Sequence, residues 1–133
     1  MTTDELCERL RVTRREVHWW ANTGLVPCRR GLGGCREFDD DGALAAAIVA
    51  DLRRKGVSLH RIRGLHIRHP HREYLAVGRA GPGGRTCFWW CGERDLLKHV
   101  AACPGPCLVV SVEDLRKRLH DQDPPRFARR KAN

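Results

Sequence analysis

Through the first half of the chain, apolar side chains recur every three or four residues, which is the spacing of one face of an amphipathic helix. Four helices are expected there. The first begins at Thr2 or Thr3 and the second at Thr13, the third runs from about Asp40 to Lys55 behind the acids Asp39–Asp41, and Ser58 caps the fourth. Their inward-facing residues are Leu6 and Leu10, then Val17, Trp20 and Ala21, then Leu44, Ile48 and Leu52, and finally Leu59, Ile62 and Leu65.

The second of these helices and the loop behind it form the most informative segment. Thr13 and Glu16 have the spacing of a capping box, and Gly24 supplies a left-handed stop after about Thr23. The Gly-rich loop that follows, from Arg29 to Arg36, carries three arginines and no acid. A short helix with basic residues near its N-terminus, followed by a basic loop, is typical of a winged helix-turn-helix. In that fold the helix enters the major groove and the loop lies along the adjacent backbone.

The pattern changes after Leu65, and Pro70 prevents the last helix from continuing because proline has no amide donor. Two strands around a Gly-rich turn, a helix, a third strand and a final helix are expected next, at 74–78, 86–91, 93–102, 107–112 and 112–120, with the turn at 81–84. The predicted fold class is therefore α+β. Its three parts are an N-terminal four-helix winged helix-turn-helix at residues 1–68, a small β-β-α-β-α module at 73–120 and a disordered basic tail at 121–133.

Charge and composition agree with a nucleic-acid partner. The formal net charge of +9 over 133 residues favours a polyanion, although GC-rich genomes also yield arginine-rich proteins without that role. No apolar stretch approaches the ~20 residues that span a bilayer. The acidic start at Asp4 and Glu5 lacks the basic and apolar regions of a signal peptide. We therefore expect a cytoplasmic protein without a membrane partner.

Residues 2–67 resemble the DNA-binding domain of the MerR family of transcription regulators. The matching pieces stand in the family's order. They are the helix start VTRREV, the triplet His18-Trp19-Trp20 where the family usually has Arg-Tyr-Tyr, then TGLVP, then GGCREF where the family has Asn-Gly-Tyr-Arg-x-Tyr, and finally LRRKGVSLHRI. The resemblance implies a sequence-specific regulator of transcription that binds double-stranded DNA as a dimer on an inverted repeat. In the family, effector binding twists the promoter so that RNA polymerase can engage it.

The resemblance places the DNA contacts on the second helix and the loop. The predicted DNA-binding residues are Thr13, Arg14, Arg15, His18, Trp19, Arg29, Arg30 and Arg36. Some of these residues also have a plainer interpretation. Arg14 and Arg15 can be solvated residues of a helix start, and Trp19 can cover the core. Trp20 is expected in the core. With His18 in place of arginine, the preferred base sequence stays open.

The cysteines allow several interpretations. Cys87 and Cys91 form one C-x3-C pair, Cys103 and Cys107 another, and Cys28 and Cys35 flank the basic loop. On a strand, positions 87 and 91 are ~13 Å apart, which prevents one metal from taking both thiols unless the strand is bent. Buried free thiols, a disulfide such as Cys103–Cys107 and a metal site all stay open. His66, His69 and His71 have ligand-like spacing in an expected linker.

Two other function classes compete with a transcription regulator. An excisionase-like DNA-architectural accessory would share the winged helix, although excisionases are usually shorter. A thiol-based redox or metal enzyme would explain the cysteines, but the sequence contains no C-x2-C motif, no His-Cys pairing that it can place and no clear catalytic carboxylate. We expect no enzyme activity and no cofactor.

Dimerisation must take another route than in the family, because Pro70 precludes the long helix of a coiled coil. Trp89 points to the opposite sheet face from Phe88 and Trp90. One face covers the module's own helices, so we expect the other face, beside Trp89 or Trp90, to be partly open unless a partner buries it. The sequence therefore predicts a homodimer through the C-terminal module, with Trp89 or Trp90 in the interface.

Overall fold

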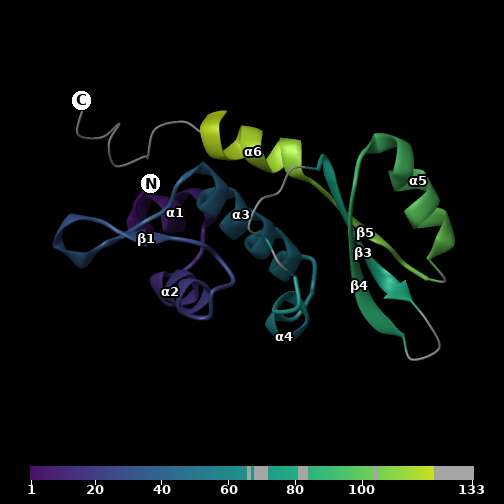
Figure 1. Cartoon of the computed structure of the whole chain (residues 1–133), viewed down its shortest axis with the longest axis horizontal. Helices are drawn as coiled ribbons and strands as arrows, with labels where there is room; N and C mark the ends of the chain where they lie inside the picture. The colour runs from purple at the N-terminus through teal and green to yellow at the C-terminus, as the bar shows by residue number, and fades with distance from the viewer. Residues whose placement is uncertain (66, 68–71, 81–83, 104, 122–133) are drawn as a thin grey trace.

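A computed structural model of the chain describes residues 1–65, 67, 72–80, 84–103 and 105–121. Helices and two antiparallel sheets alternate, and the predicted mixed class is confirmed (Figure 1). The elements are α1 (Thr3–Leu10), α2 (Arg14–Asn22), β1 (Arg29–Arg30), the 3-10 turn η1 (Leu32–Gly34), β2 (Arg36–Glu37), α3 (Asp40–Arg54), α4 (Leu59–Ile62), β3 (Tyr74–Ala80), β4 (Arg85–Cys91), α5 (Glu93–Ala102), β5 (Leu108–Ser111) and α6 (Val112–Asp121).

Side-chain caps fix where the N-terminal helices begin. The Thr2 hydroxyl accepts a hydrogen bond from the Glu5 amide at 3.2 Å, and the Glu5 carboxylate accepts one from the Thr2 amide at 2.9 Å. Asp39 and Ser58 accept from the amides three residues ahead, at 2.8 and 3.4 Å. These bonds satisfy amides that have no partner within the helix, which is why polar residues with short side chains mark the starts.

The alanine-rich helix α3 forms the centre of the molecule, and every residue from Gly42 to Ala50 is buried. The core around it takes Leu6 from α1 and Val17 and Trp20 from α2. It also takes side chains from the second half, namely Leu75, Val77, Val110, Val112, Leu115 and Leu119. The two halves of the chain therefore share one hydrophobic core.

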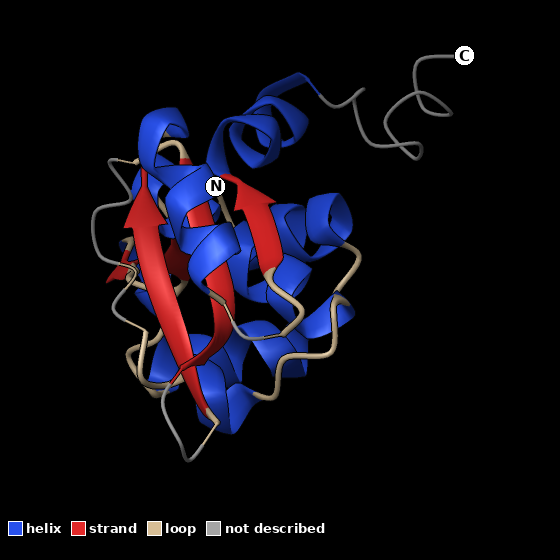
Figure 2. Cartoon of the chain, turned by 90° about the vertical axis from the view of Figure 1, so that its right-hand side faces the viewer, coloured by secondary structure: helices blue, strands red, loops and turns tan. Residues whose placement is uncertain are grey.

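The larger sheet has the order β4-β3-β5, and helices lie on both of its faces (Figure 2). Leu75 and Val77 of β3 are paired with Trp90 and Phe88 of β4, and all four pack with the core. Trp89, on the other face, stacks on His99 of α5 with ring centroids 5.6 Å apart. The expectation of an open sheet face beside Trp89 or Trp90 is thus wrong, because the N-terminal half covers the face that α5 does not.

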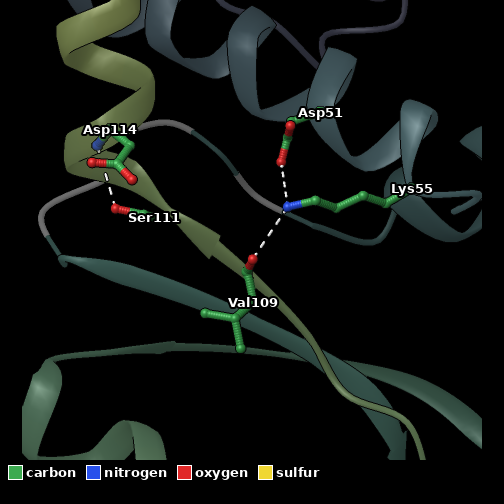
Figure 3. Close-up of polar contacts among 5 residues, drawn as sticks. All are labelled: Asp51, Lys55, Val109, Ser111 and Asp114. Carbon is green, nitrogen blue, oxygen red and sulfur yellow. Dashed lines mark hydrogen bonds and ion pairs between the residues drawn. The ribbon is translucent and has the colours of Figure 1, made fainter.

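Polar contacts also join the halves (Figure 3). Lys55 at the end of α3 forms an ion pair with Asp51 at 2.8 Å and donates a hydrogen bond to the Val109 carbonyl of β5 at 3.2 Å. The charged end of α3 is thereby fixed against the edge of the sheet. Within the second half, the Ser111 hydroxyl at the end of β5 accepts from the Asp114 amide in the first turn of α6 at 3.3 Å.

Some predicted features lie outside the described residues. These are the centre of the turn after β3, the set His66, His69 and His71 with Pro70, and all but the first residue of the tail at 121–133. Within the described ranges, no helix is both long enough and apolar enough to cross a membrane.

Candidate nucleic-acid interface

The start of α2 is held by the predicted capping box. The Thr13 hydroxyl accepts from the Glu16 amide at 3.1 Å, and the Glu16 carboxylate accepts from the Thr13 amide at 3.4 Å. Arg14 and Arg15 occupy the first turn behind this cap, and both side chains are exposed. The cap therefore fixes the point from which two guanidinium groups leave the helix.

The helix buries one face and presents the other. Val17 and Trp20 are almost completely buried, as predicted, whereas Trp19 is 38 % exposed. His18 is half-buried, and Asn22 at the end of the helix is exposed. Residues 15, 18, 19 and 22 therefore form the outward surface of α2, since side chains three and four positions apart share a helix face.

The loop behind α2 is a short hairpin, residues 29–37, which we call the wing. Its strands pair Arg29 with Glu37 and Arg30 with Arg36. At its tip, Gly33 and Gly34 both have φ of +77°, a conformation that glycine adopts without the steric cost of a side chain. At its base, the Phe38 amide donates to the Met1 carbonyl at 2.8 Å.

Arg36 connects the wing to α2. Its guanidinium group is hydrogen-bonded to the His18 ring nitrogen Nδ1 and donates to the Asn22 side-chain oxygen. Two elements separated in sequence are thereby held in one orientation. The sequence predicts Arg36 and His18 as DNA contacts but not the bond between them, because they are 18 positions apart.

The other arginines have weaker partners or none. Arg14 forms an ion pair with Asp4 at 3.2 Å, and Arg29 forms one with Glu37 at 3.5 Å. Exposed pairs of this kind contribute little free energy, so either guanidinium can exchange its carboxylate for a phosphate. Arg30 donates to the Gly34 carbonyl at 2.8 Å, within the wing. Across the described residues, the Arg15 side chain has no hydrogen bond or ion pair.

The exposure of one apolar side chain of the wing was not predicted from the sequence. Leu32, in the turn η1, is 100 % exposed and lies between the glycines of the tip and the paired arginines. Its hydrophobic character alone would have predicted burial.

The cysteines are all free thiols in the structure. Cys28, just before the wing, and Cys35, within it, are exposed, whereas Cys91 is buried. Burial raises the pKa of the Cys7, Cys91 and Cys107 thiols, and the neighbouring Cys103 thiol raises that of Cys107 further. No three His, Cys, Asp or Glu side chains of the described segments converge on a position that could hold a metal ion.

A capped helix with arginines in its first turn, attached to a basic hairpin and supported by a small helical core, defines a DNA-binding protein of the winged helix-turn-helix class. Residues 1–66 match the family model described as MerR HTH family regulatory protein. The N-terminal half of the chain therefore belongs to the MerR family of DNA-binding transcription regulators, as its sequence resemblance predicts. The match ends before β3. No curated protein matches the chain.

Proposed function

We propose that this protein is a cytoplasmic, non-enzymatic transcription regulator that binds specific double-stranded DNA, with α2 in the major groove and the wing on the flanking phosphates. The observation that carries the proposal is the bonding of Arg36 to both His18 and Asn22. It supports a rigid unit of helix and wing, which fixes the angle at which a groove-binding helix meets the backbone.

The individual roles follow from position and chemistry. Arg15 and His18 on the outer face of α2 are the proposed base contacts, with Thr13 and Arg14 at the adjacent phosphate. Trp19 has a flat apolar ring and one N–H donor, which suit a deoxyribose and a phosphate oxygen. On the wing, Arg29 and Arg30 neutralise phosphates, and Arg36 adds charge while orienting the helix.

A homodimer is part of the proposal, because one short recognition helix buries too little surface for tight specific binding. The module is the proposed dimerisation surface. Among the module's described residues, the large hydrophobic side chains that are exposed are Leu97, 77 % exposed, and Val100, 37 % exposed, both on α5. Replacing Leu97 with Ser should shift the solution mass from dimer towards monomer in light scattering. A wild-type monomer at ~100 µM would contradict this assembly.

RNA polymerase is the further partner proposed from the family's role at promoters. The long helix through which family members transmit an effector signal has no counterpart among the described elements.

One observation favours the alternative function, a DNA-architectural accessory of the excisionase kind. Leu32 projects fully exposed from the wing tip, and apolar side chains that insert between base steps bend DNA. A circular-permutation mobility assay distinguishes the two functions. A bend that Leu32→Ala abolishes, without loss of affinity, would favour the architectural role.

The main test is selection of binding sites by the full chain from a random duplex library. The proposal predicts an enriched inverted repeat whose half-sites lie about one helical turn apart. Enrichment of a single half-site would support sequence-specific binding but contradict the proposed dimer. Failure to enrich any motif would contradict the proposed function.

A further inference from the structure

A cavity of about 430 Å³ lies where α3 and α4 meet the larger sheet, at the junction of the MerR-like half and the module. Its apolar walls include Val57 from the turn before α4, Val77 from β3 and Leu108 from β5. This volume lies within the range of small-molecule sites, roughly 300–1,000 Å³, and such sites combine mostly apolar walls with a few polar groups. The cavity is therefore large enough for a compact organic molecule.

Three cations reach the same cavity, namely Lys55, Arg61 and Arg79. Lys55 is already bonded to Asp51 at 2.8 Å and to the Val109 carbonyl at 3.2 Å (Figure 3). The side chains of Arg61 and Arg79 have no hydrogen bond or ion pair with any described residue. No carboxylate is among the described residues that line the cavity. Two guanidinium groups thus retain their full hydrogen-bonding capacity beside an apolar wall.

We propose that this cavity binds a small organic anion, whose carboxylate lies between Arg61 and Arg79 and whose apolar body contacts Val57, Val77 and Leu108. Guanidinium groups bind carboxylates through paired, charge-assisted hydrogen bonds, which supplies the orientation. The aliphatic walls supply the burial that an inorganic anion would not use. Because binding uses both the guanidinium groups and the aliphatic walls, the site distinguishes this ligand from free phosphate, which has no apolar part.

The location gives the site a consequence for regulation. Arg61 belongs to the DNA-binding half and Arg79 to the module, so one ligand contacts both halves of the chain. An anion that bridges them changes DNA affinity if it favours one arrangement of α4 against the sheet. This coupling rests on the proposed function, whereas binding of the anion does not.

Isothermal titration of the full chain without DNA tests the binding. The probes are 2-naphthoate, the neutral 2-naphthalenemethanol and inorganic phosphate. We expect 2-naphthoate to bind at least about tenfold more tightly than the other two. Arg61→Gln and Arg79→Gln should each weaken it about tenfold, since each removes a hydrogen bond to a charged group. Arg63→Gln is the matched control, because Arg63 directly follows α4 and does not line the cavity.

Equal affinity for the naphthoate and the neutral alcohol would overturn the proposal. So would unchanged naphthoate affinity in Arg61→Gln and Arg79→Gln variants that unfold at the wild-type temperature. If duplex DNA displaces 2-naphthoate, and both variants flatten the salt dependence of DNA binding, the two arginines bind backbone phosphates and the proposal is also overturned. A change in DNA affinity on adding 2-naphthoate, absent in Arg79→Gln, supports the coupling.

Discussion

Arg14 and Arg15 leave the same turn of α2, yet their surroundings differ. Arg14 is paired with Asp4 at 3.2 Å, whereas Arg15 projects from the outer face of the helix without a described partner. A free, exposed guanidinium at the start of a recognition helix is the group best suited to a guanine edge.

Replacing Arg15 with Ala should therefore change which base is preferred at one position of the site, at a cost of about 1–3 kcal/mol for the cognate base. The measurement is the affinity for single-base variants of the selected duplex. Arg85→Ala at the start of β4, away from α2, is the control and should bind as wild type (Figure 1). Equal loss of affinity for every duplex would place Arg15 on a phosphate instead.

The thiols should differ in reactivity according to their surroundings. Burial raises the pKa of Cys91 and Cys107, so less of each is thiolate at neutral pH, and thiolate is the form that reacts. Iodoacetamide at about pH 7.5 should label exposed Cys28 and Cys35 before Cys91 and Cys107, as followed by peptide mass spectrometry. Labelling of Cys107 as fast as Cys28 would contradict the burial described for it.

The same pKa shifts affect stability at alkaline pH. The folded chain holds the protons of Cys7, Cys91 and Cys107 more tightly than the unfolded chain does. The unfolded thiols ionise first as pH rises through the ordinary value of 9.0. Their contribution to the free energy of unfolding is therefore constant below that pH and declines above it.

At the scale of elements, α2 depends on its capping box. Thr13→Ala removes the acceptor for the Glu16 amide and should lower the free energy of unfolding by about 1 kcal/mol, as measured by urea denaturation. Glu16→Gln is the matched control, because an amide oxygen still accepts from the Thr13 amide. A Thr13→Ala protein with the wild-type urea midpoint would show that the cap does not stabilise α2.

The sequence predicted the helices and strands well where the residues that determine an element lie within it or at its ends. The capping residues and the period of three to four residues placed α1, α2 and α3 nearly to the residue, since caps and burial faces lie within each helix. The strands β3 and β4 were placed within two residues at each described end. Glycine and proline at their borders were the signal.

Contacts between distant segments were not predictable in the same way. Nothing within the wing indicates that Arg36 bonds to His18, because these residues are 18 positions apart and meet only through the fold. Either Trp89 or Trp90 was expected at a partly exposed face, since the alternation of a strand shows that two faces exist but not what covers them. The cavity beside Arg61 and Arg79 likewise depends on packing between the two halves.

At the scale of the whole molecule, the shared core predicts that the two halves unfold together. Leu119 of α6 is 2 % exposed and packs in the same core as Leu6 and Trp20. Leu119→Ala should lower the free energy of unfolding of the entire chain by about 2–5 kcal/mol, whereas Leu32→Ala at the exposed wing tip should change it by less than about 0.5 kcal/mol.

Urea unfolding followed by circular dichroism and by tryptophan fluorescence should then give coincident curves, since Trp20 and Trp90 report on opposite halves. Two separated transitions would show that the predicted domains at 1–68 and 73–120 are independent folding units.

The central claim, that helix and wing together bind duplex DNA, is tested most directly by the salt dependence of binding. If three wing arginines and at least two α2 residues meet phosphates, log K against log salt should have a slope of roughly −4 or steeper per monomer. Arg36→Ala should weaken binding to all sequences alike and flatten that slope by about one unit, while Arg85→Ala leaves it unchanged. An affinity that does not change between ~50 and ~200 mM salt would contradict the account.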